Sequence, residues 1–254
     1  MYNSPTYYLT SISDVDNFLS RFTHDNNYKD GNEELAVGNR IYIGSTTSSD
    51  PVWIIAGFDV EHSKTAADGT VYDNGYGIAL VPGTTFEHAN TRWDSSINNI
   101  PYLHSDIFKA TNNSGTPGDP ATTSSIFTNL RYASSHFVKR NLLLSDKLDS
   151  SGYSCSYKWT QSYMSLLSYA QITGSVGTMN TIYDDGEANY QLPLFKYEGI
   201  RAVYGNYWLR NINNTDSIYY VSSSREPYSK YYKETIYSKR YIESCGIAGM
   251  IYIR

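Results

Sequence analysis

Tyrosine and serine side chains crowd one stretch near the end of the chain. Residues 219–237 read YYVSSSREPYSKYYKETIY, and only Val221 and Ile236 in this stretch are aliphatic. A tyrosine ring offers a large rigid contact area with few torsions to freeze, and its phenol both donates and accepts hydrogen bonds. Serine and asparagine add small, adaptable polar contacts. This combination is typical of surfaces that hold a ligand without reacting with it.

Sugars and proteins are both suited to such a surface. The C–H face of a sugar stacks on an aromatic ring while its hydroxyls meet phenols, amides and carboxylates. We expect the binding side chains to be Asn213, Asp216, Tyr219, Tyr220, Ser222, Arg225, Tyr228, Tyr231, Tyr232 and Tyr237. If Tyr220 points inward beside Val221, it belongs to the core instead, because strand neighbours face opposite sides. The alternative is a β-rich surface merely coated with tyrosine, since strands favour aromatic residues.

Three carboxylates gather in the segment YDDGEANYQLPLF. Asp184, Asp185 and Glu187 could supply the hard oxygen ligands that calcium prefers. The register of an EF-hand is absent, and a carboxylate cap or turn is the alternative interpretation. We expect no other cofactor.

The residues that usually carry catalysis form no recognisable motif. The five histidines are scattered, and neither a GxSxG elbow nor an HExxH pair occurs. Cys155 and Cys245 lack metal-type spacing, so we expect two reduced thiols in preference to a disulfide. A Ser-His-Asp set assembled only in three dimensions is left open, because triads are defined by geometry. We therefore expect a protein that is not an enzyme.

Composition excludes two classes of partner. The net charge is -5 and the 20 basic residues are spread thinly, so we expect no nucleic-acid partner. No apolar run approaches the roughly 20 residues that cross a bilayer, and the N-terminus lacks the features of a secretory signal. The chain has 26 tyrosines but 8 phenylalanines. Since a buried phenol must find a hydrogen-bond partner, many of these tyrosines should lie at surfaces.

Apolar spacing predicts the elements that must position these residues. Residues 13–22 have the i, i+3, i+4 and i+7 pattern of a short amphipathic helix behind Ser13 as the N-cap. Residues 40–44 and 52–60 read as a hairpin of two strands, and GIALVP reads as a third.

The middle of the chain predicts helices and its end predicts strands. Residues 110–124 are small and polar, which favours a loop. Helical spacing follows over residues 124–145 and again over 158–174, where Gly174 ends the pattern. Short strands are predicted in NYWLRNI, SIYYVSS and GIAGMIYIR. A single α+β domain, with helices in the middle and β structure at both ends, accounts for this order.

An ordered set of segments makes the chain resemble a known family. The segments are VWIIAGFDVEH, DGTVYDNGYGIALVP, HFVKRNLLLS, YDDGEANYQLPLF, YWLR and the terminal GIAGMIYIR. They resemble domains of bacteriophage tail and fibre proteins and of gut-bacterial surface proteins. That family is similar to C-type lectins, in the branch of formylglycine-generating enzymes and phage tropism determinants. The resemblance implies a C-type-lectin-like fold of mixed short strands, two or three helices and long loops. It covers residues 36–254, with residues 1–35 as a helix-bearing segment packed on that domain.

The resemblance also implies a role for the tyrosines. In such folds the stretch between the Trp-Leu-Arg tract and the last strand is the exposed ligand-binding face, which corresponds to residues 211–244 here. The implied protein is a phage receptor-binding or tail-fibre tip protein, made in the host cytoplasm and carried on the virion. Its expected partners are a bacterial surface glycan or protein and other virion subunits, with a homotrimer as the expected assembly and no membrane insertion.

Two other functions stay open at this point. A structural virion component, such as a baseplate, collar or head decoration, would use the same face for subunit contacts. An enzyme of the formylglycine-generating type or a polysaccharide depolymerase is the other alternative. Nothing around Cys155 or Cys245 resembles the active-site segment of formylglycine-generating enzymes.

Overall fold

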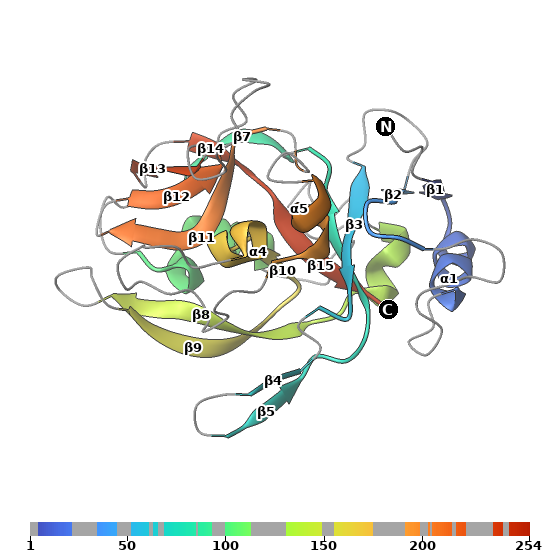
Figure 1. Cartoon of the computed structure of the whole chain (residues 1–254), viewed down its shortest axis with the longest axis horizontal. Coiled ribbons are helices and arrows are strands. Elements are labelled where there is room, and N and C mark those ends of the chain that lie inside the picture. The colour runs from blue at the N-terminus through green and yellow to red at the C-terminus, as the bar shows by residue number, and fades with distance from the viewer. Residues whose placement is uncertain are drawn as a thin grey trace.

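Continuous apolar runs become the central strands of a six-stranded sheet in the computed structural model of the chain (Figure 1). The sheet order is β1-β2-β3-β6-β15-β10, and β1 and β2 are its parallel pair. The strands are β1 (Thr6–Leu9), β2 (Arg40–Ile43), β3 (Trp53–Phe58), β6 (Ile78–Pro82), β15 (Gly249–Ile253) and β10 (Met164–Leu166). The structure describes residues 5–21, 35–44, 52–60, 63–65, 69–84, 86–92, 100–112, 131–148, 155–174, 191–198, 203, 205–214, 217–221, 236–240 and 244–254.

The central strands are apolar throughout because both faces of this sheet are covered. Ile55, Leu80 and Ile251 face one buried cluster, which we call the first cluster. Their strand neighbours Ile54, Val81 and Met250 face a second cluster on the other side. A strand covered on both sides reads as a continuous apolar run instead of an alternating one.

A five-stranded sheet has the order β13-β12-β11-β14-β7. Trp208 and Ile218 join the first cluster from this sheet, and Leu209 and Val221 join the second. Both clusters are therefore shared with the larger sheet. The strands are β13 (Ile236–Arg240), β12 (Ser217–Val221), β11 (Tyr207–Asn214), β14 (Ser244–Ile247) and β7 (Phe86–Arg92).

Two antiparallel ribbons complete the β structure. In β8 (Arg140–Leu148), which pairs with β9 (Cys155–Ser162), Leu142 and Leu144 point into the first cluster. The shorter ribbon, β4 (Ser63–Thr65) and β5 (Val71–Asp73), projects from the body beside β8 and β9 (Figure 1).

The helices are short, and side chains cap the starts of α1 and α4. The hydroxyl of Ser11 caps α1 by accepting from the backbone N–H of Asp14 at 3.1 Å. Ser168 and Gln171 form a capping box at the start of α4, and Gly174, at φ 78°, ends that helix. The helices are α1 (Ile12–Ser20), α2 (Asp106–Asn112), α4 (Tyr169–Thr173) and α5 (Pro193–Glu198), with 3-10 turns η2 (Tyr102–His104) and η3 (Arg131–His136). None of the described helices is both long enough and apolar enough to span a bilayer.

The N-terminal segment is joined to the rest by packing and by one histidine. Val15 and Phe18 of α1 are buried in the first cluster, and β1 adds the edge strand of the larger sheet. The imidazole of His136 lies with Nε2 2.8 Å from the Asp16 carboxylate and Nδ1 3.0 Å from the carbonyl oxygen of Arg254. His136 therefore links α1 to the end of β15.

Two helix predictions are wrong. The described part of 124–145 forms η3 and most of β8, and residues 158–174 form the rest of β9, β10 and only one turn of helix. The N-cap of α1 is Ser11, not Ser13, and α2 extends into the predicted loop as far as Asn112. The described chain is thus a sheet-rich α+β protein with few helices. The C-type-lectin-like fold and the boundary at residue 35 stay predictions.

Candidate functional site

The antiparallel ladder of β11, β12 and β13 carries four of the ten predicted binding residues: Asn213, Tyr219, Tyr220 and Tyr237. Its register sets Tyr220 between Trp208 on one side and Tyr237 on the other. The ladder thus brings aromatic positions from three strands abreast. Asp216, Ser222, Arg225, Tyr228, Tyr231 and Tyr232 lie outside the described residues.

Tyr219 and Tyr220 are half-buried, and their rings help to anchor the ladder. Tyr220 packs on the first cluster, with its ring edge-on to Trp208 at 6.3 Å between centroids. Tyr219 packs on the second cluster, with its ring edge-on to Tyr169 at 6.0 Å. Burial raises the pKa of the Tyr219 phenol, and the neighbouring phenol of Tyr169 raises it further. Only the outer parts of these two rings are open to a ligand.

The sequence left open whether Tyr220 points into the core or toward a ligand, and the structure shows a half-buried side chain that packs on the core. Val221 faces the second cluster while Tyr220 faces the first, so the two side chains do alternate. Because both faces of β12 are covered, alternation does not free either neighbour completely. Tyr220 contributes to packing on the side opposite Val221.

The ladder divides the predicted binding residues between two ends. At one end Asn214 pairs with Ser217, so Asn213 lies near that end. At the other end Val221 pairs with Ile236, so the connection 222–235 leaves and rejoins the ladder at neighbouring positions. A strand rises about 3.3 Å per residue, which separates the two ends of β12 by roughly 13 Å. Among the described binding residues, Asn213 therefore lies toward one end of β12, and Tyr237, opposite Tyr220, lies toward the other.

The Trp-Leu-Arg tract fixes the ladder to the rest of the fold. Trp208, Leu209 and Arg210 are fully buried. The backbone N–H of Arg210 donates to the carbonyl of Leu167 at 3.0 Å, and Nη1 lies 3.3 Å from the hydroxyl of Ser165. The amide oxygen of Asn211 accepts from the backbone N–H of Tyr169 at 2.6 Å. These bonds hold β11 against β10 and α4.

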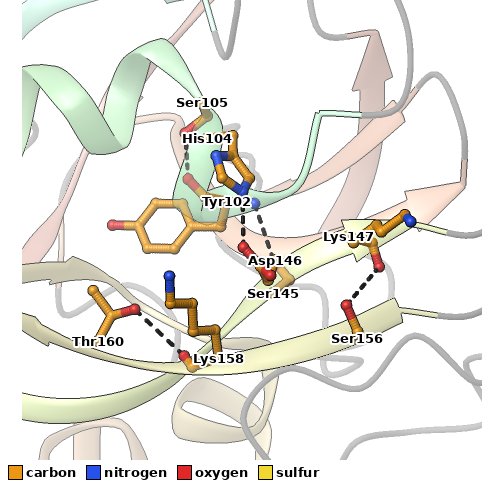
Figure 2. A network of polar contacts seen from close by, with 9 residues as sticks. All are labelled: Tyr102, His104, Ser105, Ser145, Asp146, Lys147, Ser156, Lys158 and Thr160. Atoms are coloured by element: carbon orange, nitrogen blue, oxygen red, sulfur yellow. Dashed lines mark hydrogen bonds and ion pairs between the residues drawn. The ribbon is translucent and has the colours of Figure 1, made fainter.

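A network of polar side chains lies where the 3-10 turn η2 meets β8 (Figure 2). The β8–β9 register shifts between Ser145 and Lys147, which leaves Asp146 at a bulge. There its carboxylate lies 2.8 Å from Nε2 of His104. The neighbouring Ser145 hydroxyl accepts from the backbone N–H of Tyr102 at 2.9 Å.

His104 and Asp146 resemble the histidine and carboxylate of a catalytic triad. The neighbouring serine hydroxyls, however, are hydrogen-bonded to backbone groups. The Ser105 hydroxyl donates to the carbonyl of Tyr102 and accepts from the backbone N–H of Phe108. Among the described residues, neither Ser105 nor Ser145 is hydrogen-bonded to His104. The buried Tyr102 phenol accepts from the backbone N–H of Leu166 at 2.9 Å. The contacts therefore support a structural role, in which the group ties η2 to β8 and β10.

The predicted calcium ligands Asp184, Asp185 and Glu187 lie outside the described residues, so calcium binding stays a prediction. In the part of the chain that the structure describes, no three His, Cys, Asp or Glu side chains gather closely enough to hold a metal ion.

An aromatic pair outside the predicted face was missed by the sequence analysis. The rings of Tyr72 in β5 and Trp159 in β9 are stacked, with centroids 4.0 Å apart and planes 18° from parallel. Both side chains are half-buried. The alternation of Tyr157, Trp159 and Gln161 along β9 was the available signal, and a helical interpretation of that segment hid it.

Comparison of the chain with family models, with curated proteins and with solved structures finds no match.

Proposed function

We propose that this chain is a non-enzymatic binding module with a C-type-lectin-like fold, and that it acts as the receptor-binding tip of a phage tail fibre. Its ligand is a glycan or a protein on the bacterial surface. The observation that carries the proposal is the β12–β13 pairing at Val221 and Ile236. It sets both ends of the tyrosine-rich connection 222–235 at one end of a firmly held ladder.

The composition of this connection supports a contact role. Residues 222–235 read SSSREPYSKYYKET, which contains three tyrosines and no aliphatic side chain. The ladder beneath it already has its packing aromatics, because Tyr207 and Trp208 are fully buried and Tyr219 and Tyr220 are half-buried. We therefore assign Tyr228, Tyr231 and Tyr232 to contact with the ligand.

The proposed assembly compensates for a weak single site. A surface of tyrosine, serine and asparagine gives modest affinity, on the order of micromolar, for one ligand. A homotrimer on a fibre tip would engage several ligands at once, and avidity would raise the apparent affinity by about a hundredfold or more. Contacts with other virion subunits belong to the same proposal.

The test changes Tyr228, Tyr231 and Tyr232 together to Ala. We expect an almost unchanged melting temperature and a loss of binding to an array of bacterial surface glycans and to intact cells. The matched control changes Tyr8, Tyr42 and Tyr76 to Ala, which removes three half-buried or exposed rings from other strands and loops.

Two outcomes would reject the proposal. Unfolding of the first variant, but not of the control, would show that these tyrosines belong to the core. A folded variant that binds as strongly as the unchanged chain would show that the ligand meets another surface. Running the array with and without a calcium chelator tests the ion independently.

A further inference from the structure

We propose that the stacked rings of Tyr72 and Trp159 form a second binding site, and that this site holds a neutral pyranose ring of an oligosaccharide. The site lies on β5 and β9, outside the tyrosine-rich C-terminal face. It rests on the proposed function only for the bacterial origin of the sugar.

The exposure of Trp159 is the first step of the argument. Trp53 and Trp208 are 1% and 0% exposed, as core tryptophans are. Trp159 is only half-buried and pairs with a half-buried tyrosine from a different ribbon. An indole ring that remains partly in water without being needed in either buried cluster is suited to stack on an apolar ligand face.

The pair is held in position before any ligand arrives. Asn74, two residues after Tyr72, is buried, and its amide bonds both backbone groups of Asn141 in β8. The Asn141 N–H donates to Oδ1 of Asn74 at 2.6 Å, and Nδ2 of Asn74 donates to the Asn141 carbonyl at 3.2 Å. These two hydrogen bonds attach the end of β5 to the edge of β8. The Tyr72 ring therefore reaches Trp159 at little further entropic cost.

The polar groups beside the rings select the kind of ligand. Gln161 stands two residues from Trp159 and so shares its side of the ribbon, and Asn141 is its cross-strand partner. Their side-chain amides lie 3.4 Å apart, with Gln161 exposed. Each amide both donates and accepts hydrogen bonds, which matches sugar hydroxyls. On the side that carries Trp159, the β8–β9 ribbon offers rings and amides and no charged residue at these positions, which favours a neutral sugar as the ligand. A charged residue, Lys64 of β4, is the register partner of Tyr72, so the acidic probe is the direct test of this preference.

The experiment follows the indole N–H of Trp159 by ¹H–¹⁵N NMR. The probes are linear hexasaccharides of glucose, mannose, xylose and N-acetylglucosamine, and an acidic galacturonate hexasaccharide serves as the negative probe. At least one neutral probe should shift the Trp159 signal in a saturable way, while the signals of the buried Trp53 and Trp208 stay in place. The acidic probe should leave all three unchanged.

Variants locate the site. Trp159→Ala should weaken binding by about tenfold or more, since one aromatic stack supplies most of the contact. Gln161→Ala changes an exposed side chain that the fold does not need, and should weaken binding by several-fold with an unchanged melting temperature. Tyr8→Ala is the matched control, because it removes an exposed ring that stacks on Tyr42 at the far edge of the larger sheet.

The outcomes separate this inference from the proposed function. The titration should reach a sugar concentration about ten times a Kd of about 1 mM. If no neutral hexasaccharide shifts the Trp159 signal up to that concentration, the sugar site is rejected. Binding that survives at full strength in both Trp159→Ala and Gln161→Ala rejects it as well. The variant lacking Tyr228, Tyr231 and Tyr232 should keep the Trp159 response. If that variant loses receptor binding and Trp159 never responds, the second site alone is wrong.

Discussion

Replacing Asn74 by Ala tests how a side chain serves as a strand partner. Asn74 is 4% exposed, and its amide satisfies the N–H and the carbonyl of Asn141. Each hydrogen bond contributes about 1 kcal/mol net to the free energy of unfolding, and a buried polar group that loses its partner costs about 1–3 kcal/mol. We therefore expect Asn74→Ala to lower the free energy of unfolding by about 2–3 kcal/mol. Asn74→Asp keeps one acceptor but sets a second carboxylate oxygen against the Asn141 carbonyl and buries a charge, so its effect should be at least as large.

Equilibrium unfolding in urea measures this loss, and an unchanged m-value confirms that the native state keeps its compactness. Hydrogen exchange at the Asn141 amide should become faster, because its acceptor is gone. The Trp159 fluorescence should also change, since β5 is no longer held beside β9. Gln161→Ala is the control, because it breaks only an exposed bond of 3.4 Å and should cost less than about 0.5 kcal/mol. A loss below about 0.5 kcal/mol for Asn74→Ala, with Asn141 exchange unchanged, would refute the reasoning.

Three further predictions concern other parts of the fold. The pKa of Tyr219 is raised in the folded state, whereas an unfolded tyrosine ionises near pH 10. Above about pH 10 the folded chain therefore holds more protons than the unfolded chain, so the free energy of unfolding should fall as the pH rises. Tyr219→Phe should make that fall less steep in urea titrations between about pH 9 and about 11. His136→Ala removes the bonds to Asp16 and Arg254 and should cost about 1–2 kcal/mol in urea unfolding, while His104→Ala, at a 56% exposed side chain, should cost less. Gly174→Ala puts an alanine in the left-handed backbone region, with its Cβ 3.2 Å from the Gln191 side chain. The change should lower the free energy of unfolding by about 1–2 kcal/mol in thermal unfolding, and no change would show that the helix end relaxes.

The strands at both ends of the chain were predictable because their local pattern and their environment agree. The runs at 52–58 and 77–82, within the predicted strands, are apolar throughout, and they become β3 and β6, which lie between two buried clusters. A short apolar run bounded by turn residues indicates a buried strand without knowledge of its neighbours. The same reasoning succeeded for β11, β12 and β15.

The middle of the chain was not predictable by the same means. In β8 the inward residues are Arg140, Leu142 and Leu144, which alternate, but Leu143 between them turns the signal into an unbroken apolar run. In residues 158–174 the apolar positions fit a helix by chance, while cross-strand pairing of β9 with β8 decides the structure. Strand formation depends on the partner, which a local pattern does not contain.

The candidate site was predictable in its chemistry but not in its arrangement. Tyrosine density at 219–237 marked a region that joins the ladder, yet only the register reveals that Tyr220 lies between Trp208 and Tyr237 and that Val221 and Ile236 are paired. Nothing near Tyr72 in the sequence indicates that its ring meets Trp159, because that contact depends on the attachment of Asn74 to Asn141.

The position of β15 affects how the protein is made. This strand lies between β6 and β10, and both are synthesised well before it. Until residues 249–253 leave the ribosome, the facing edges of those two strands have no partner in this sheet and can pair with another nascent chain. Translation that stalls shortly before this point would leave a product in which β10 is separated from the other four strands of the largest sheet, suited to chaperone capture and prone to aggregation.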